Sequence, residues 1–203
     1  GSSKSVVDLT TSLFLKNDVL VIPSLNTSAI IGSIPHPGGA PRLVWRTTAN
    51  TTTRVEALAA LMSAYIEPEV RRRAARRHEK GDVSVALVAR HSSASMAVSA
   101  ELAARLRFNG KSASENGDRF REFQLLDVES DPLQNQLTVA NLRDFHPHVV
   151  VLGDVSDEMI NGIVNPLEDG WDLSLGAGPL YVVNGSLEGI TLEQMARPPE
   201  PVL

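Results

Sequence analysis

The amino-acid sequence predicts an α/β fold, a three-layer αβα arrangement around a mainly parallel sheet. Short apolar segments alternate with helical segments from Val83 to Val183, the order typical of parallel strands covered by helices. The apolar segments are short and rich in valine, as expected of strands that are buried on both faces. Each is followed by a polar loop that opens the next helix. A chain of 203 residues can bury a large core in one or two domains.

The clearest unit of this pattern begins at Val83. A buried strand is predicted over Val83–Ala89, and the sequence turns polar over Arg90–Ser93. A helix follows, with Gly110 as its stop. We expect its buried face to consist of Met96, Val98, Ala100, Leu102, Ala103 and Leu106.

The segment before this unit contains weaker elements. A helix is predicted over Val6–Lys16 and a short helical turn over Ala29–Ile31. Two short strands are predicted over Val19–Ile22 and Leu43–Thr47, and Pro23 closes the first because it cannot donate a hydrogen bond to a sheet.

A long helix precedes the central unit. Asn50 or Thr51 can cap it, and Pro68 is expected to kink or restart it. The restarted part carries a run of arginines, which we interpret as a solvated helix face. Its buried face is predicted to consist of Val55, Leu58, Ala59, Met62 and Ile66.

Three strands and two helices are predicted after the central unit. The strands are Phe123–Leu126, Val149–Leu152 and Leu180–Val183. The first helix begins at Asp131-Pro132, a cap followed by proline; the second is capped by Ser156 or Asp157 and stops at Gly170.

Composition and motifs narrow the function classes. The net charge of -5 and the aromatic content of 4% disfavour a nucleic-acid partner, and the absence of cysteine excludes disulfides and thiolate chemistry. No apolar run approaches the roughly 20 residues that span a bilayer. The glycine-rich motifs of nucleotide binding and the G-x-S-x-G motif of hydrolases are missing. Because these motifs are missing, we predict no cofactor and no enzymatic activity. We also predict no metal site, because His146 and His148 have no carboxylate fixed beside them by sequence.

Short hydrogen-bonding residues follow the predicted strands. In a parallel sheet these strand ends share one edge, where hydroxyls, amides and backbone N–H groups suit a small polar ligand. The alternative is that the same residues are helix caps and turn residues, which Ser, Asn and Asp favour in any case. The residues concerned are Ser24, Asn26, Thr27, His91, Ser92, Ser93, Asp154, Ser156 and Asn184.

Four segments resemble the type I periplasmic binding proteins, and more narrowly the branched-chain amino-acid (leucine/isoleucine/valine) receptors of ABC transporters. That family has an I-S-P-x-x-T strand and loop, an F-R-T strand before a helix, a V-A-x-x-x-D-x-x-Y-G strand and loop, and a P-D-x-V strand followed by an E-M helix. The similar segments here are Ile22–Thr27, Trp45–Thr47, Val85–Ser95 and His148–Met159.

The resemblance implies ligand contacts at matching positions. The first ligand loop falls on Leu25, Asn26 and Thr27, with Thr27 in place of the family threonine. The family's aspartate and tyrosine are not kept within Arg90–Ser95. The two later loops fall on Val155 with Ser156, and on Asn184.

The resemblance also implies an organisation and a setting. We expect residues 1–42 to be the remnant of a first lobe, residues 43–193 a second α/β lobe and residues 194–203 a loose tail, so that the chain is a fragment of a full receptor. The expected protein is periplasmic or extracellular, with a lipid anchor as one form of attachment. It would bind a small polar ligand such as an amino acid and work with a membrane permease or a sensor.

Two alternatives stay open. One is a flavodoxin-like or Rossmann-like enzyme domain, against which the missing glycine motif argues. The other is the effector-binding module of a LacI-type regulator, which shares the two-lobed fold and would need a DNA-binding head upstream.

Overall fold

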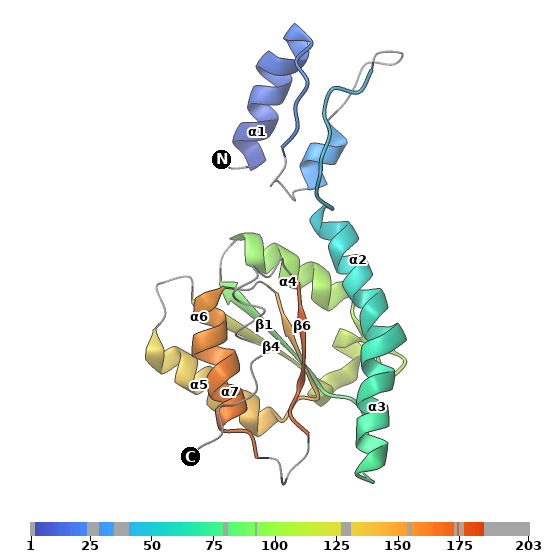
Figure 1. Cartoon of the computed structure of the whole chain (residues 1–203), viewed down its shortest axis with the longest axis vertical. Helices are drawn as coiled ribbons and strands as arrows, with labels where there is room; N and C mark the ends of the chain where they lie inside the picture. Colours follow the sequence, from blue (N-terminus) through green and yellow to red (C-terminus); the bar gives the residue numbers. More distant parts are fainter. Residues whose placement is uncertain are drawn as a thin grey trace, which may run out of the picture. The chain divides into compact units, whose positions relative to one another are not determined.

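A computed structural model describes residues 3–23, 29–34, 41–78, 81–91, 93–126, 131–153, 156–172, 174 and 177–184. The chain divides into two compact units, Gly1–Ala57 and Leu58–Leu203. The boundary between them falls within a helix, α2 (Thr51–Leu61). Figure 1 shows the elements of both units, each of which is described by itself.

The first unit begins with one helical segment. Helix α1 (Ser3–Leu9) continues through the π-helical turn η1 (Thr10–Phe14) and the 3₁₀ turn η2 (Leu15–Asn17). It ends at Asp18, which adopts a left-handed backbone with φ 53°. The predicted helix is therefore confirmed, and so is the predicted helical turn, which forms η3 (Ala29–Ser33).

The two predicted strands of the first unit are wrong as regular strands. Only Val21 and Val44 form a bridge, which is parallel. The Val21 N–H donates to the carbonyl of Leu43 at 2.8 Å, and the Trp45 N–H donates to the carbonyl of Val21 at 3.0 Å. Val19, Leu20 and Ile22 are exposed rather than buried. Within the described residues no further strand pairs with this bridge, and an isolated pair of strands is only marginally stable.

The long helix is confirmed, and so is the restart at Pro68, although the backbone stays helical throughout. Helix α2 is followed by a π-helical segment, η4 (Met62–Ile66), and by α3 (Glu67–Arg76). Pro68 lies in the first turn of α3, directly after η4. A π-helical turn shifts the hydrogen-bond pattern by one residue, which lets the helix accommodate a residue without an N–H. The Thr53 N–H donates to Asn50 Oδ1 at 2.6 Å, as expected of the predicted cap.

The second unit is built on a four-stranded sheet in the order β4-β1-β5-β6 (Figure 1). All of its strand pairs are parallel. Strands β5 (Val149–Leu152) and β6 (Leu180–Val183) have the predicted bounds, whereas β1 (Val85–His91) and β4 (Phe120–Leu126) are displaced or extended by two or three residues. This part of the chain is thus mixed α/β with an all-parallel sheet, consistent with the predicted αβα layout.

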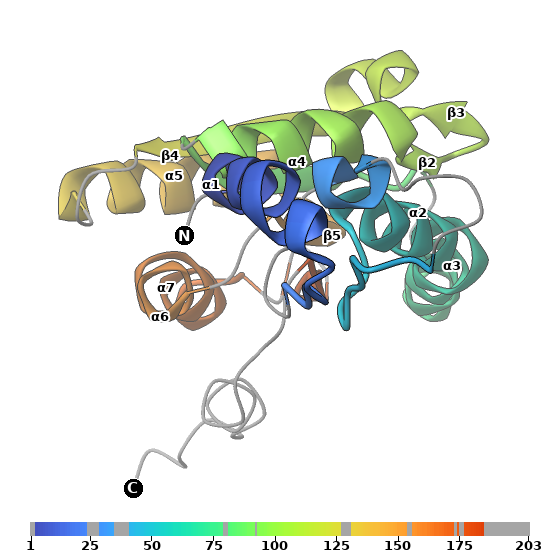
Figure 2. The same ribbon diagram turned by 90° about the horizontal axis from the view of Figure 1, so that it is seen from above.

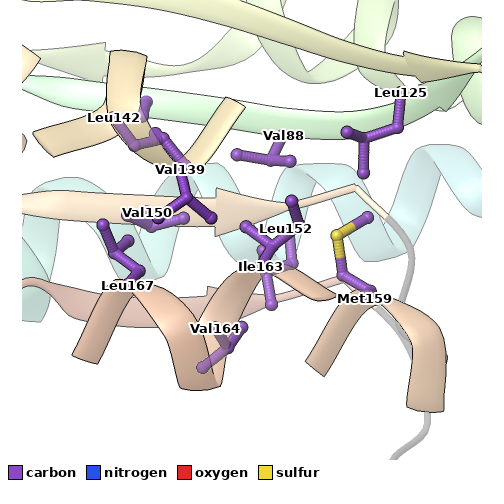
Figure 3. Packing of buried hydrophobic residues seen from close by; sticks show 11 residues of the cluster. Val88, Leu125, Val139, Leu142, Val150, Leu152, Met159, Ile163, Val164 and Leu167 are labelled. Atoms are coloured by element: carbon purple, nitrogen blue, oxygen red, sulfur yellow. The ribbon is translucent and has the colours of Figure 1, made fainter. Parts of the chain in front are cut away.

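A core fills one face of the sheet. Helix α5 (Pro132–Phe145) and the helical run α6 (Asp157–Met159), η6 (Ile160–Val164) and α7 (Asn165–Asp169) contribute to it. Figure 3 shows their side chains meeting those of the strands. The cluster consists of Ala86, Val88, Leu125, Val139, Leu142, Val150, Leu152, Met159, Ile163, Val164 and Leu167.

Helix α4 (Ser93–Arg105) connects β1 to β4, and α5 carries the chain back past β1 to β5 (Figure 2). Right-handed crossovers in opposite directions place α4 and α5 on opposite faces. The predicted buried face of α4 is wrong in part, because Met96 and Ala100 are exposed. The residues that α4 buries fully are Ser95, Ser99 and Leu102.

A short hairpin follows α4. Its strands are β2 (Arg107–Phe108) and β3 (Lys111–Ser112), which pair antiparallel. Asn109 and Gly110 both have positive φ, 54° and 73°, as the tightest type of hairpin turn requires. The 3₁₀ segment η5 (Ala113–Arg119) leads on to β4. The polar stretch after Gly110 is thus ordered as a strand and a helical turn. None of the described helices is long and apolar enough to cross a bilayer.

Candidate functional site

The strand order creates a switch point at the carboxyl edge of the sheet. From β1 the chain moves to one neighbour, β4, and later arrives at the other neighbour, β5. The connections that leave β1 and β5 therefore run to opposite faces. In open α/β sheets ligands bind in the crevice that forms there, outside the carboxyl ends of the strands. This edge is the candidate site.

Most of the predicted ligand residues cannot be placed at this edge. Seven of them lie outside the described residues, and the side chain of Ser93, the first residue of α4, lies outside them as well. The seven are Ser24, Leu25, Asn26, Thr27, Ser92, Asp154 and Val155.

Three predicted residues remain. Ser156 is the N-cap of α6, whereas His91 and Asn184 share the edge but are not neighbours. His91 ends β1 and is exposed, and its Nδ1 lies 3.1 Å from Gln124 Oε1 on β4. Asn184 directly follows β6 and is buried, and its N–H donates to the carbonyl of Leu152 at 3.0 Å. Strand β5 lies between β1 and β6. One compact ligand would therefore reach His91 and Asn184 only by spanning the end of β5.

Arg90 is the main contributor that was not selected from the sequence. Its guanidinium donates hydrogen bonds to Ser156 Oγ and, at 2.8 Å, to Glu158 Oε2. Ser156 is also the N-cap of α6, since its Oγ accepts from the Met159 N–H at 3.3 Å. The end of β1 is thus tied to the start of α6, across the switch point. We call these three residues, Arg90, Ser156 and Glu158, the clasp.

The clasp holds one carboxylate in its ionised form. Hydrogen bonds from Ser156, from the backbone of Glu158 itself and from Arg90 keep the pKa of Glu158 below its usual value. Only about a third of the Arg90 side chain is exposed. The site thus presents a guanidinium that has a solvent-exposed carboxylate among its partners. A basic residue at a strand end and an acidic residue near a helix cap are visible in the sequence, but only the strand order brings them together.

Beneath the edge the backbone is closely packed. A Cβ atom at Gly153, the residue after β5, would lie 3.1 Å from both Ala89 Cβ and Ser99 Oγ. Only glycine fits here without displacing a neighbour. The Oγ of Ser99 is buried and has no hydrogen-bond partner among the described residues. The small residues of α4 therefore let the helix lie close to the ends of β1 and β5.

A cavity of about 60 Å³ lies at the opposite, amino edge of the sheet. The motif His146-Pro147-His148 lines it, together with residues of α3 and of the segment before β6. The two histidines do not form a metal cluster: no group of three or more His, Asp or Glu side chains in the described part of the chain could hold an ion. The sequence offered no signal for this cavity, because its walls come from three separate segments.

Comparison of the chain with known protein-family models, with curated proteins and with solved structures gives no match.

Proposed function

We propose that this chain is the ligand-binding part of an exported two-lobed receptor, of the type that serves as the solute-binding component of an ABC transporter. It binds a small polar ligand at the carboxyl edge of the parallel sheet and is not an enzyme. The observation that carries the proposal is the switch point between β1 and β5, which is bordered by Arg90, His91 and Ser156.

The groups at this edge suit a ligand with a carboxylate. A guanidinium binds a carboxylate through two parallel hydrogen bonds, and Arg90 already holds the carboxylate of Glu158. A ligand carboxylate can take the place of Glu158 because that side chain is mostly exposed and gains solvent when it is released. The serine hydroxyl of the clasp and the imidazole of His91 supply further hydrogen bonds. An amino acid or a similar small acid is therefore the expected ligand.

The receptor mechanism follows from the two-lobed arrangement that the sequence resemblance implies. Closure of two lobes about a hinge would bury the ligand and create the surface that a permease or sensor recognises. The periplasmic or extracellular location and the membrane partner belong to the same proposal.

A flavodoxin-like domain is the second candidate, and one observation favours it. In chain order the four strands are arranged 2-1-3-4 across the sheet, which matches the start of the flavodoxin-like order. Flavodoxins, which have that order, bind flavin mononucleotide at the same switch point. Against it stands the lack of a glycine-rich loop for close approach to a phosphate.

A thermal-shift screen of the whole chain separates the two candidates. The panel contains branched-chain and polar amino acids, their amides, flavin mononucleotide and NAD. A ligand at 100 times its Kd stabilises the folded state by about 2.7 kcal/mol. We expect a shift with an amino acid, a smaller shift with its amide and no shift with the nucleotides.

The variant Arg90→Gln locates the binding at the clasp. We expect it to abolish the amino-acid shift, whereas Arg119→Gln, which removes an exposed arginine from η5, keeps it. A shift with flavin mononucleotide alone would replace the receptor proposal by the flavodoxin-like one. The absence of any shift would contradict both.

A further inference from the structure

The cavity at the amino edge of the sheet has a chemical character of its own. It lies at the other end of β5 from the clasp, because His148 precedes that strand and Gly153 follows it. Its lining residues are Val70, Arg73, Ala74, Arg77, His146, Pro147, His148, Ala177, Gly178 and Leu180. It therefore combines cationic or hydrogen-bonding groups with an apolar wall, and no carboxylate is among these residues.

The charge on this lining is partly balanced by its neighbours. Arg73 Nε lies 2.9 Å from Glu69 Oε1, but the same carboxylate also binds Arg72, at 2.6 Å. One negative charge is thus shared by two guanidinium groups. The guanidinium hydrogen bonds of Arg72 and Arg73 lower the pKa of Glu69 to about 2, so it stays ionised. Arg77 has no ion pair within the described parts of the chain. A further carboxylate, that of Glu168, lies beside Gly178 and accepts a hydrogen bond from Tyr181. The lining itself supplies the guanidinium groups of Arg73 and Arg77 and no carboxylate.

The histidine side of the cavity is held by a buried serine. The Ser84 N–H donates to His148 Nδ1 at 3.0 Å, and Ser84 Oγ lies 2.7 Å from the same nitrogen. A nitrogen that accepts a hydrogen bond carries no proton, so the ring proton of His148 is on Nε2 and the ring is a neutral donor. Ser84 Oγ also lies 3.2 Å from the carbonyl oxygen of His146, and its single proton serves one of these two acceptors at a time. Ser84 is buried, so it orders this wall rather than reacting with a ligand.

The His146 side is fixed by its own contacts. His146 is the C-cap of α5 with φ 50°, and its ring stacks on Trp171 at 4.4 Å between centroids with an interplanar angle of 18°. The indole is therefore in contact with a residue that lines the cavity, and its fluorescence can report binding there. The other tryptophan, Trp45, is exposed and belongs to the first unit.

We propose that this cavity is a second binding site, for a small aliphatic carboxylate. The guanidinium groups of Arg77 and Arg73 bind the carboxylate, and the apolar wall of Val70, Ala74 and Leu180 contacts the aliphatic part. One water molecule occupies about 10–15 Å³ when cavity volume is measured in this way. A cavity of 60 Å³ therefore has room for about four to six waters. An ion of the size of propionate fits this space, and a larger acid would extend into solvent.

Fluorescence titrations of the whole chain test the proposal. In the variant Trp45→Phe, the only tryptophan is Trp171. We expect a saturable change of its emission with propionate and none with propionamide, which has the same shape without the charge. Inorganic phosphate should bind more weakly, since it cannot use the apolar wall. An equal response to propionamide, or tighter binding of phosphate, would overturn the proposal.

A pair of arginine variants in the Trp45→Phe background assigns the site. We expect Arg77→Gln to weaken propionate binding at least about tenfold, the effect of losing one charge-assisted hydrogen bond. Arg76→Gln removes the same charge one residue earlier on α3, outside the cavity lining, and should leave the affinity unchanged. Equal weakening by both variants would mean non-specific attraction and would refute the site. Unchanged thermal midpoints show that both variants are folded, and Arg90→Gln should not alter propionate binding.

Discussion

The carboxyl and amino edges of the parallel sheet differ in how their strand ends are packed against the neighbouring segments. At each edge the strands end and the chain must turn into helices. At the carboxyl edge the clasp ties β1 to α6, and Gly153 allows Ala89 and Ser99 to lie close to the backbone. At the amino edge Ser84 orders the histidine wall, but the space beside it is left open as a cavity. Close packing and an ion pair at one edge thus contrast with an open cavity lined by two arginines at the other.

A glycine at each edge gives the strongest test of this contrast. We expect Gly153→Ala to lower the free energy of unfolding by about 1–3 kcal/mol, because its methyl group must displace Ala89 or Ser99. Gly178→Ala at the cavity should change it by less than about 0.5 kcal/mol, because the nearest side-chain atom would lie 3.7 Å away. Urea denaturation measures both. Equal effects would show that the two edges are packed alike.

Two buried serines, Ser84 at the amino edge and Ser99 at the carboxyl edge, allow the hydrogen bonding of the two edges to be compared. Ser84→Ala leaves the His148 ring without its hydroxyl partner and should lower the free energy of unfolding by about 1–2 kcal/mol. Ser99→Ala removes a buried hydroxyl that has no partner within the described chain, so stability should stay the same or rise by up to about 1 kcal/mol. The same denaturation experiment compares them. A loss in Ser99→Ala as large as in Ser84→Ala would reveal a hydrogen bond at the carboxyl edge.

Tyr181 on strand β6, near the amino edge, should make the stability of the chain depend on pH in the alkaline range. Burial, and then the hydrogen bond that Tyr181 donates to Glu168 at 2.7 Å, raise the pKa of Tyr181 above its usual value of 10. Protonated Tyr181 therefore contributes its full stabilisation of the folded state below about pH 10. This contribution is lost above that pH, because the tyrosine of the unfolded chain ionises there. We expect stability to fall above that pH in the native chain and to fall less in Tyr181→Phe. Phenolate absorbance in a Tyr65→Phe background follows Tyr181 alone, and ionisation of Tyr181 at its usual pKa would contradict this.

The smallest expected effect is a loss of stability at acidic pH, through Glu158 of the clasp. The lowered pKa of Glu158 means that its stabilising contribution is present above its usual value of 4.5 and is lost as the pH falls through the folded value. Ser156→Ala and Arg90→Gln should each raise the pKa of Glu158, since each removes a hydrogen bond that keeps this pKa low. Carboxyl-carbon NMR titration measures both values, with Arg119→Gln as the control. An unchanged pKa in both variants would mean that the clasp is open in solution.

The sequence was most informative where an element depends on its own residues. The valine-rich strands β5 and β6 were predicted with their bounds, and the caps Asp131 and Ser156 mark real helix starts. The predicted strand around Val21 failed because a strand depends on its partners, and here it finds only one bridge.

The two sites were harder to predict than the fold. The loop between β1 and α4 was selected from the sequence, but the link from Arg90 to Glu158 depends on β1 and β5 being neighbours. The buried face of α4 was misplaced because close contact with the sheet favours serines over Met96. The amino-edge cavity depends on three segments meeting, which no local pattern encodes.

The central position of β1 has a consequence for synthesis on the ribosome. Val85–Ala89 is fully buried, and its pairing partners begin at Phe120 and Val149. This buried strand is therefore made before either neighbour exists. Until β4 and β5 are synthesised, the unpaired edges of β1 can pair with other nascent chains, a recognised route to aggregation. Nascent chains that end before β5 should need chaperone protection, and chains that include β5 should need much less.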